Sequence, residues 1–235
     1  MVCLIVKDHT WPKDADNVRP ITLIGMFCKV FERLLLCCFD AGGWAKVQPT
    51  QAGFCSHYST CVNAAVLHAL LESCRITHVA FLDFKAAFDV VNHALLLDIL
   101  CRRGCLPRLQ GLVASLTFHH IRSRIVSDGE ASDWFSRGKG VLQGSPLSPY
   151  LFNIFVDGLL EDLNNGATIV PQSLFYADDS TLLASSSSEI QRLLDIVANW
   201  SAQHRMTLNV KKCGYIALPD DQAQVHLGDE ALPQL

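Results

Sequence analysis

The chain has 235 residues, of which 50% are hydrophobic and 18% are charged, and its formal net charge is −4. This composition excludes the disordered class, which combines low hydrophobicity with high charge, and it predicts one large folded domain or two small ones. The apolar runs are too short to cross a bilayer, so no membrane segment is expected. The ten cysteines, in a chain with no predicted secretion signal, indicate a reducing compartment in which thiols stay unpaired.

The acidic balance is unusual for a protein that binds nucleic acid, because phosphate contacts normally need an excess of lysine and arginine. The charges are unevenly distributed, however. Residues 101–140 carry more basic than acidic groups, whereas acidic groups dominate residues 157–195. A basic stretch next to an acidic one suits a protein that grips a polyanion and also concentrates metal ions. Solvated surface helices are the alternative explanation for most of these charges.

The first half of the chain contains three regular apolar patterns after an N-terminal strand over residues 1–6. Apolar residues at helical spacing predict one helix over residues 23–39 and a second over residues 60–71. The residues of the second helix that are expected to face inward are Val62, Ala65, Val66, Ala69 and Leu70. The compact apolar run at residues 78–84 predicts a buried strand whose tip is Asp83.

The middle of the chain continues with a helix over residues 92–103 and a turn. Two strands are then expected on either side of the turn-forming residues 127–129. A further helix is predicted over residues 147–163. Residues 169–176 and 180–184 together predict a hairpin whose turn holds Asp178 and Asp179.

The last part of the chain begins with a polar stop and a helix over residues 189–204. One face of this helix is apolar and should point inward, through Ile190, Leu193, Leu194 and Val197. Two short strands are expected to follow, over residues 206–210 and 214–218.

Three aspartates stand where predicted strands end, namely Asp83, Asp178 and Asp179. A carboxylate at the end of an apolar strand is costly unless it is paired or bound to a cation. Oxygen ligands favour Mg²⁺, and carboxylates from two strands can hold two ions roughly 3.5 to 4 Å apart. That arrangement stabilises both the attacking and the leaving oxygen in phosphoryl transfer. Each aspartate taken alone would be an ordinary turn residue, but together they predict a two-metal site of the polymerase type.

Six sequence blocks in the same order resemble the motifs of reverse transcriptases from non-LTR retrotransposons. The blocks around the predicted chemistry are FLDFKAAFD at 81–89, GVLQGSPLSP at 140–149, FYADD at 175–179 and LNVKKC at 208–213. Two upstream blocks, within residues 19–29 and 51–60, resemble the fingers motifs of that family. The resemblance implies an α+β right-hand polymerase fold, in which an antiparallel sheet forms the palm, helices form the fingers and the thumb is largely absent.

The resemblance also implies a division of the chain into parts. Fingers are expected over residues 1–77 and 92–140, and the palm over residues 78–91 and 141–218. Residues 219–235 would be an extension toward the missing thumb. The implied reaction is RNA-directed DNA synthesis, in which dNTPs are added to the 3′-hydroxyl of a DNA primer on an RNA template. Two Mg²⁺ ions, with Mn²⁺ as a substitute, would serve this reaction.

In this family the motif positions have defined roles, which the resemblance transfers to the matching residues. Asp83, Asp178, Asp179 and the carbonyl of Phe84 are expected to bind the metal ions. Lys212 is expected to donate a proton to the leaving pyrophosphate.

A second group of residues is expected to bind the incoming nucleotide. Phe88 matches the bulky ring that excludes a ribose 2′-hydroxyl. Gln143 and Gly144 match the segment under the incoming base and the primer end, where a glycine permits close approach of the backbone. Arg19 and Lys29 match cationic positions that clamp phosphates.

Some positions depart from the family pattern or fall outside its chemistry. Cys55 and Tyr58 stand where the family commonly has basic residues, which removes template or nucleotide contacts. Asp89 is expected to support the following turn by a local hydrogen bond, and Asp157 is expected to be structural.

Two alternatives to an active reverse transcriptase stay open. A viral RNA-dependent RNA polymerase shares the palm, but Tyr176-Ala177 before the aspartate pair and the ring of Phe88 favour DNA synthesis. The second alternative is a decayed element that keeps the fold with at most nucleic-acid binding. By analogy with the family, the longer protein would include an endonuclease and a thumb, and it would act in the nucleus.

Overall fold

The computed structural model describes residues 1–6, 18–73, 75–119, 121–127, 130–165, 171–218 and 224–235. The chain forms two compact units. Unit 1 consists of Met1–Lys46 and Phe88–Phe152, and unit 2 of Val47–Ala87 and Asn153–Leu235. Residues 47–77, which were expected to belong to the fingers, are therefore in the same compact unit as the strand that carries Asp83. The assignment of fingers and palm to the chain stays a prediction.

Unit 1 combines a small sheet with three helices. The sheet has the order β2-β1-β5-β6 and is built from β1 (Val2–Val6), β2 (Val18–Thr22), β5 (Ile125–Ser127) and β6 (Glu130–Ala131). A separate pair joins β4 (Arg122–Ser123) to β7 (Phe135–Ser136). The helices are α1 (Met26–Gly42), α4 (His93–Arg102) and α5 (Pro107–Thr117). The N-terminal strand, the strands on either side of the turn and two of these helices were predicted, but β2 and α5 were not. The predicted turn residues Asp128 and Gly129 lie outside the described residues.

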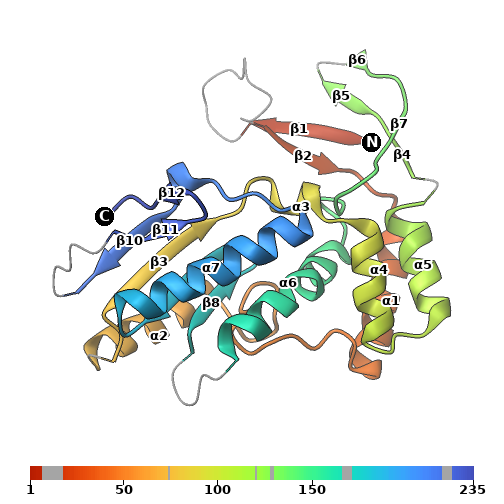
Figure 1. The fold of residues 1–235 in the computed structure, drawn as a ribbon. Coiled ribbons are helices and arrows are strands. Elements are labelled where there is room, and N and C mark those ends of the chain that lie inside the picture. Colours follow the sequence, from red (N-terminus) through yellow and green to blue (C-terminus); the bar gives the residue numbers. More distant parts are fainter. Residues whose placement is uncertain (7–17, 74, 120, 128–129, 166–170, 219–223) are drawn as a thin grey trace. The chain divides into compact units, whose positions relative to one another are not determined.

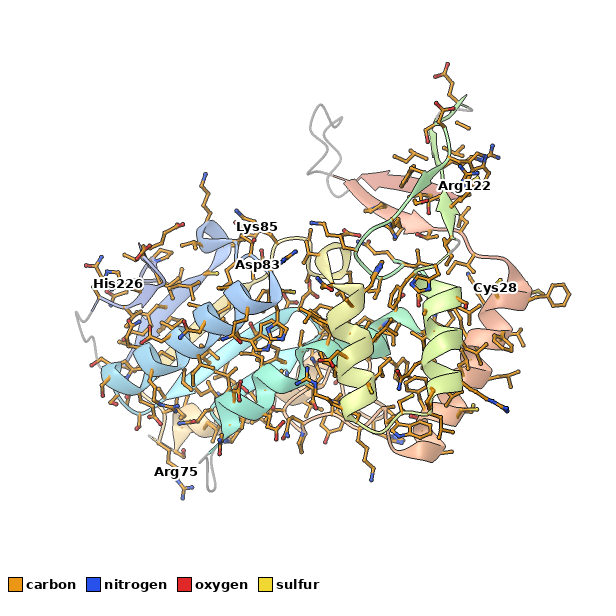
Figure 2. The ribbon with its side chains drawn as sticks, turned by 45° about the vertical axis from the view of Figure 1, so that its right-hand side comes forward. Cys28, Arg75, Asp83, Lys85, Arg122 and His226 are labelled. Carbon is orange, nitrogen blue, oxygen red and sulfur yellow. The ribbon has the colours of Figure 1, made fainter. Side chains whose placement is uncertain are left out.

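Helix α1 buries a narrower stripe than its apolar sequence indicates. Leu35, Phe39 and Glu32 are buried, whereas the side chain of Phe27 is 92% exposed and that of Leu34 is 58% exposed. Figure 2 labels Cys28 on the same helix, where it is also exposed. The contacts of α1 within the unit include α5. The apolar residues of α1 therefore predicted the helix correctly but did not identify its buried face.

Unit 2 is built on an antiparallel sheet with the order β10-β3-β9-β8. Its strands are β3 (His78–Asp83), β8 (Ser173–Tyr176), β9 (Asp179–Ala184) and β10 (Gly214–Ala217). Helices α2 (Thr60–Glu72) and α7 (Ser187–His204) belong to this unit, whereas α3 (Ala87–Val90) and α6 (Ser148–Asn164) run across its boundaries. Helix α7 packs against β3 and β9, and also against β11 (His226–Leu227), which pairs with β12 (Glu230–Ala231) (Figure 1).

The predicted inward face of α7 is confirmed, because Ile190, Leu193, Leu194 and Val197 are each 0% exposed. The predicted face of α2 is confirmed only for Val66 and Leu70. Val62, Ala65 and Ala69 are exposed, and the residues that pack on the sheet are Val66, Leu67, Leu70 and Leu71. Their partners are Ile76, Val79, Leu174 and Leu183. Helix α2 is apolar around most of its circumference, so its sequence alone could not select the face that meets this cluster.

The predicted strand over residues 206–210 is also wrong, although β10 next to it is confirmed. Only Leu208 forms a bridge, with Phe84, and residues Val210–Lys212 form a single turn of 3₁₀ helix. Strand β10 pairs with β3 instead. The predicted first residues of the β8 strand, including Ile169, lie outside the described part of the chain. Among the described residues, no helix is long and apolar enough to cross a membrane.

Candidate active site

Two carboxylates are partners across the central strands of unit 2. Asp83 ends β3 and Asp179 begins β9, and the two residues are paired in the antiparallel register. Such partners project from the same face of a sheet. On this face Asp179 is exposed and Thr181 is half-buried, whereas Ala80 and Leu182 on the opposite face are fully buried. The two carboxylates therefore lie at the less covered end of this face, at the end of β3 where Figure 2 labels Asp83.

The third aspartate lies in the turn that joins β8 to β9. This turn consists of Ala177 and Asp178, and the pair of Tyr176 with Asp179 closes it. Ala177 has a φ of 59°, a conformation that two-residue hairpin turns usually give to glycine or asparagine. Asp178 is half-buried and directly precedes Asp179. The hairpin thus brings all three predicted aspartates to the same end of the sheet.

The donor atoms at this end of the sheet fit a divalent metal ion. Among the described residues, no three His, Cys, Asp or Glu side chains are already gathered as a ligand set. Carboxylates repel each other when no cation is present, so a closed cage is not expected. Mg²⁺ needs only one or two protein carboxylates, because water and substrate phosphates complete its octahedron. Phe84, whose carbonyl is a further predicted ligand, is buried and bridges to Leu208.

Asn209 holds the carboxylate of Asp83 in place. Its side-chain Nδ2 donates to Oδ2 of Asp83 at 3.2 Å, and its backbone N–H donates to the carbonyl of Asp83 at 2.8 Å. The Sγ of Cys213 accepts from the backbone N–H of Asp83 at 3.4 Å, and burial raises the pKa of this thiol. Asn209 was not among the predicted site residues, although the LNVKKC block contains it. Its position three residues before Lys212 in the same block was the signal that could have identified it as a site residue.

Lys212 lies near the same carboxylate. Its Nζ is 3.9 Å from Oδ2 of Asp83, and its side chain is 70% exposed. An ion pair as exposed as this one contributes little to stability, so it leaves the amine available to another anion. The structure therefore groups Asp83, Asp178, Asp179 and Lys212 within unit 2.

The predicted nucleotide-binding residues belong to unit 1. Two of them, Gln143 and Gly144, form a turn that is hydrogen-bonded to the end of strand β2. Thr22 donates its backbone N–H to the carbonyl of Gln143 at 2.7 Å. Gly144 has a φ of 105°, and a Cβ atom at this position would lie 2.8 Å from the carbonyl oxygen of Thr22. Glycine is therefore required here for two reasons, the positive φ and the close approach of the backbone.

Asp89 makes contacts beyond the local one expected. Instead of only supporting a local turn, its Oδ2 accepts from Nε2 of Gln143 at 3.0 Å. Its Oδ1 lies 3.6 Å from the guanidinium of Arg137. These contacts join residues about fifty positions apart in the chain, which local turn chemistry could not have predicted. Asp89 therefore orients the side chain of Gln143.

Phe88 has a fixed ring, because it stacks on Phe152 with the ring centroids 4.5 Å apart and an interplanar angle of 15°. Lys29 is exposed on α1. Arg19 pairs with Ile5 through the backbone of β2, and its side chain lies outside the described part of the structure.

In unit 2, Asp157 accepts a hydrogen bond from a backbone N–H at 2.6 Å, in keeping with the structural role expected for it.

A buried glutamate anchors the segment that carries Gln143 and Gly144. Glu32 is 1% exposed, and its Oε2 accepts from Oγ of Ser145 at 2.6 Å and from the backbone N–H of Leu147 at 3.5 Å. Burial raises the pKa of this carboxyl, although the two hydrogen bonds and the nearby Lys29 lower it in part.

The raised pKa predicts that replacing Glu32 with glutamine changes the pH dependence of stability. A carboxyl whose pKa is higher in the folded state binds its proton more tightly there, so the folded state loses stability as pH rises above the ordinary value of 4.5. Glu32→Gln removes this loss. We expect urea unfolding to show the variant gaining stability relative to the wild type as the pH is raised from about 4 to about 8. The difference should shrink toward about pH 4. An equal difference at both pH values would contradict this explanation.

Comparisons with known proteins identify relatives of the whole chain. Residues 9–226 match the family model described as reverse transcriptase (RNA-dependent DNA polymerase). The chain is 31% identical over 217 residues to a retrovirus-related Pol polyprotein from the type-1 retrotransposable element R2 of Popillia japonica, covering 86% of the chain and 30% of the relative. It is 30% identical over 239 residues to an RNA-directed DNA polymerase from the mobile element jockey of Drosophila melanogaster, covering 92% of the chain and 25% of the relative.

Solved structures with a similar fold include apo telomerase from Candida tropicalis truncated from its C-terminal domain. The TM-score is 0.59 at 16% sequence identity, over 84% of the chain and 41% of the telomerase chain. These matches confirm the predicted resemblance and the α+β polymerase fold. Members of the matching family use divalent metal ions. The chain spans less than a third of the length of the curated relatives it matches.

Proposed function

The chain belongs to the family of reverse transcriptases (RNA-dependent DNA polymerases), and from this premise we propose that it adds deoxynucleotides to the 3′-hydroxyl of a primer on an RNA template. The observation that carries the proposal is the pairing of Asp83 with Asp179 next to the turn that holds Asp178. The chain matches less than a third of the length of its relatives. The activity, substrates and partners of such a longer protein are therefore proposed for this chain and not taken as known.

The three aspartates and the carbonyl of Phe84 would hold two Mg²⁺ ions, or Mn²⁺ as a substitute. Bound ions of this kind supply charge stabilisation for the attacking and leaving oxygens of phosphoryl transfer. The residues of the chain do the positioning. Asn209 restrains one oxygen of the Asp83 carboxylate, which would leave the other oxygen for a metal ion. Lys212, with an exposed amine near the same carboxylate, would donate a proton to the leaving pyrophosphate.

We propose that residues of unit 1 select the incoming nucleotide. The ring of Phe88, held by its stack on Phe152, would exclude a ribose 2′-hydroxyl. Gln143, oriented by Asp89, and the close-packed Gly144 would support the incoming base and the primer end. Arg19 and Lys29 would contact the phosphates.

The partners follow from the proposed reaction, and the place of action is proposed by analogy with the family. An RNA template, a DNA primer and dNTPs are the substrates, and the basic residues of the 101–140 region are suited to contact their phosphates. We also propose that the chain acts in the nucleus, as part of a longer polypeptide that supplies a thumb and an endonuclease.

The proposal is tested by offering both kinds of nucleotide on the same RNA template. We expect extension of a primer with deoxynucleotides and little extension with ribonucleotides. Extension with ribonucleotides at an equal rate would instead identify an RNA-dependent RNA polymerase.

Lys29→Ala, measured in parallel, should raise the KM for dNTPs, because one phosphate contact is removed.

A further inference from the structure

A buried glutamine contacts the catalytic turn from a segment far away in the sequence. Gln51 is 2% exposed. Its Oε1 accepts from the backbone N–H of Ala177 at 2.9 Å, and its Nε2 donates to the carbonyl of Ala177 at 3.3 Å. The same Oε1 accepts from the backbone N–H of Gly53 at 2.9 Å. One side chain therefore binds both polar groups of the first residue in the turn between β8 and β9.

Ala177 is the residue of this turn that most needs such support. Its φ of 59° lies in the left-handed region, which costs backbone energy for any residue with a Cβ atom. Both common types of two-residue hairpin turn favour glycine or asparagine at the position with positive φ. A conformation of this kind persists when the surrounding structure imposes it. The two hydrogen bonds between Gln51 and Ala177 impose it here, directly before Asp178.

The segment that carries Gln51 is itself fixed to strand β8. The backbone N–H of Ala52 donates to the carbonyl of Phe175 at 2.9 Å. Nδ2 of Asn153 donates to the carbonyl of Gly53 at 2.7 Å. Any side chain at position 53 would collide with the backbone nitrogen of Ala177, so only glycine permits this approach. These contacts hold in place the backbone segment that carries Gln51.

We propose that Gln51 is a positioning residue for the metal-binding turn: by fixing the backbone of Ala177, it sets where Asp178 presents its carboxylate. This inference rests on the proposed function, because it gives the turn a catalytic purpose. It goes beyond that function by adding a residue from the 51–60 block whose contact with the aspartate turn spans 126 positions of the chain. A purely structural role is the alternative. It predicts a loss of stability without a specific effect on metal binding.

The test uses Gln51→Met, which keeps the size of the side chain but can form neither hydrogen bond to Ala177. A matched control is Asn164→Ala. Asn164 is also part-buried and anchors the other end of β8, through Oγ of Ser173 at 2.8 Å. Binding of Mn²⁺ in the absence of nucleotide is measured by electron paramagnetic resonance of the free ion, and kcat by incorporation of thymidine triphosphate.

We expect Gln51→Met to weaken Mn²⁺ binding about tenfold and to lower kcat about 10- to 100-fold, as small misplacements of reacting groups do. Asn164→Ala should leave both within about twofold, because its contacts do not touch the turn. Ala177→Gly in the Gln51→Met background should recover part of the Mn²⁺ affinity, because glycine adopts a positive φ without support. That rescue would not occur if Gln51 only stabilised the unit.

Either of two results would overturn the inference: Mn²⁺ affinity in Gln51→Met within twofold of the wild type, or an equal loss in Asn164→Ala. Failure of the proposed function has a different signature. In that case the wild-type chain incorporates no nucleotide at all, while the comparison of Mn²⁺ binding still decides the role of Gln51.

Discussion

Replacing Asp83 with asparagine is expected to reduce nucleotide addition at least about 1,000-fold, because the variant loses a charged ligand at the point where charge develops in phosphoryl transfer. The same change should leave folding nearly intact. Asparagine keeps an oxygen that can accept from Nδ2 of Asn209, and the ion pair removed among the described residues is the exposed one with Lys212. We therefore expect the free energy of unfolding to change by no more than about 1 kcal/mol.

This prediction is measured as the rate of single-nucleotide addition together with urea unfolding of the same samples. Asp98→Asn is the matched control. Asp98 pairs with Arg102 on the exposed surface of α4, so its loss should change neither quantity. A variant at Asp83 that retained more than about a tenth of the wild-type rate would contradict the role of this carboxylate in metal binding.

Replacing Phe88 with alanine is expected to change which nucleotides are accepted. The ring is held by its stack on Phe152 and cannot easily turn aside, so its removal leaves room for a ribose 2′-hydroxyl. Discrimination against ribonucleotides, measured as the ratio of kcat/KM values, should fall about 100-fold. Incorporation of deoxynucleotides should fall much less, because the ring acts by exclusion.

The control for this variant is Phe135→Ala, at an aromatic residue of unit 1 that is 40% exposed. It should leave the discrimination unchanged. Loss of the stack should also destabilise Phe88→Ala by about 1 kcal/mol beyond the loss of buried area. If the variant lost stability but kept full discrimination against ribonucleotides, Phe88 would be a core residue and not a gate.

The sequence predicted the elements that carry the aspartates because their hydrophobic patterns are strong and local. The apolar run that ends in Asp83 and the inward face of α7 both follow from simple periodicity. Strand β2 was not predicted because it contains Pro20, and proline cannot donate a backbone hydrogen bond to a neighbouring strand. Proline does occur in edge strands, and β2 is an edge strand that pairs only with β1 in its sheet. Helix α5 was missed although Pro107 at its first turn was a signal for a helix start.

The supports of the site could not be predicted in the same way, because they depend on contacts across long stretches of chain. The hydrogen bonds between Gln51 and Ala177 and the one from Asn209 to Asp83 each span 126 positions. No periodicity or turn rule links residues so far apart. Sequence motifs marked the blocks that contain both residues, but only the fold shows which atoms they hold.

The most direct test of the account is extension of a poly(rA)/oligo(dT) hybrid with thymidine triphosphate and Mg²⁺, comparing the wild-type chain with Asp178→Asn. The protein is kept in excess over the hybrid, so that weak binding of the duplex does not limit the reaction. We predict extension by the wild type and none by the variant, with both proteins folded by circular dichroism. A folded wild-type chain that extends no primer, or an Asp178→Asn variant as active as the wild type, would contradict the assignment of these aspartates to DNA synthesis.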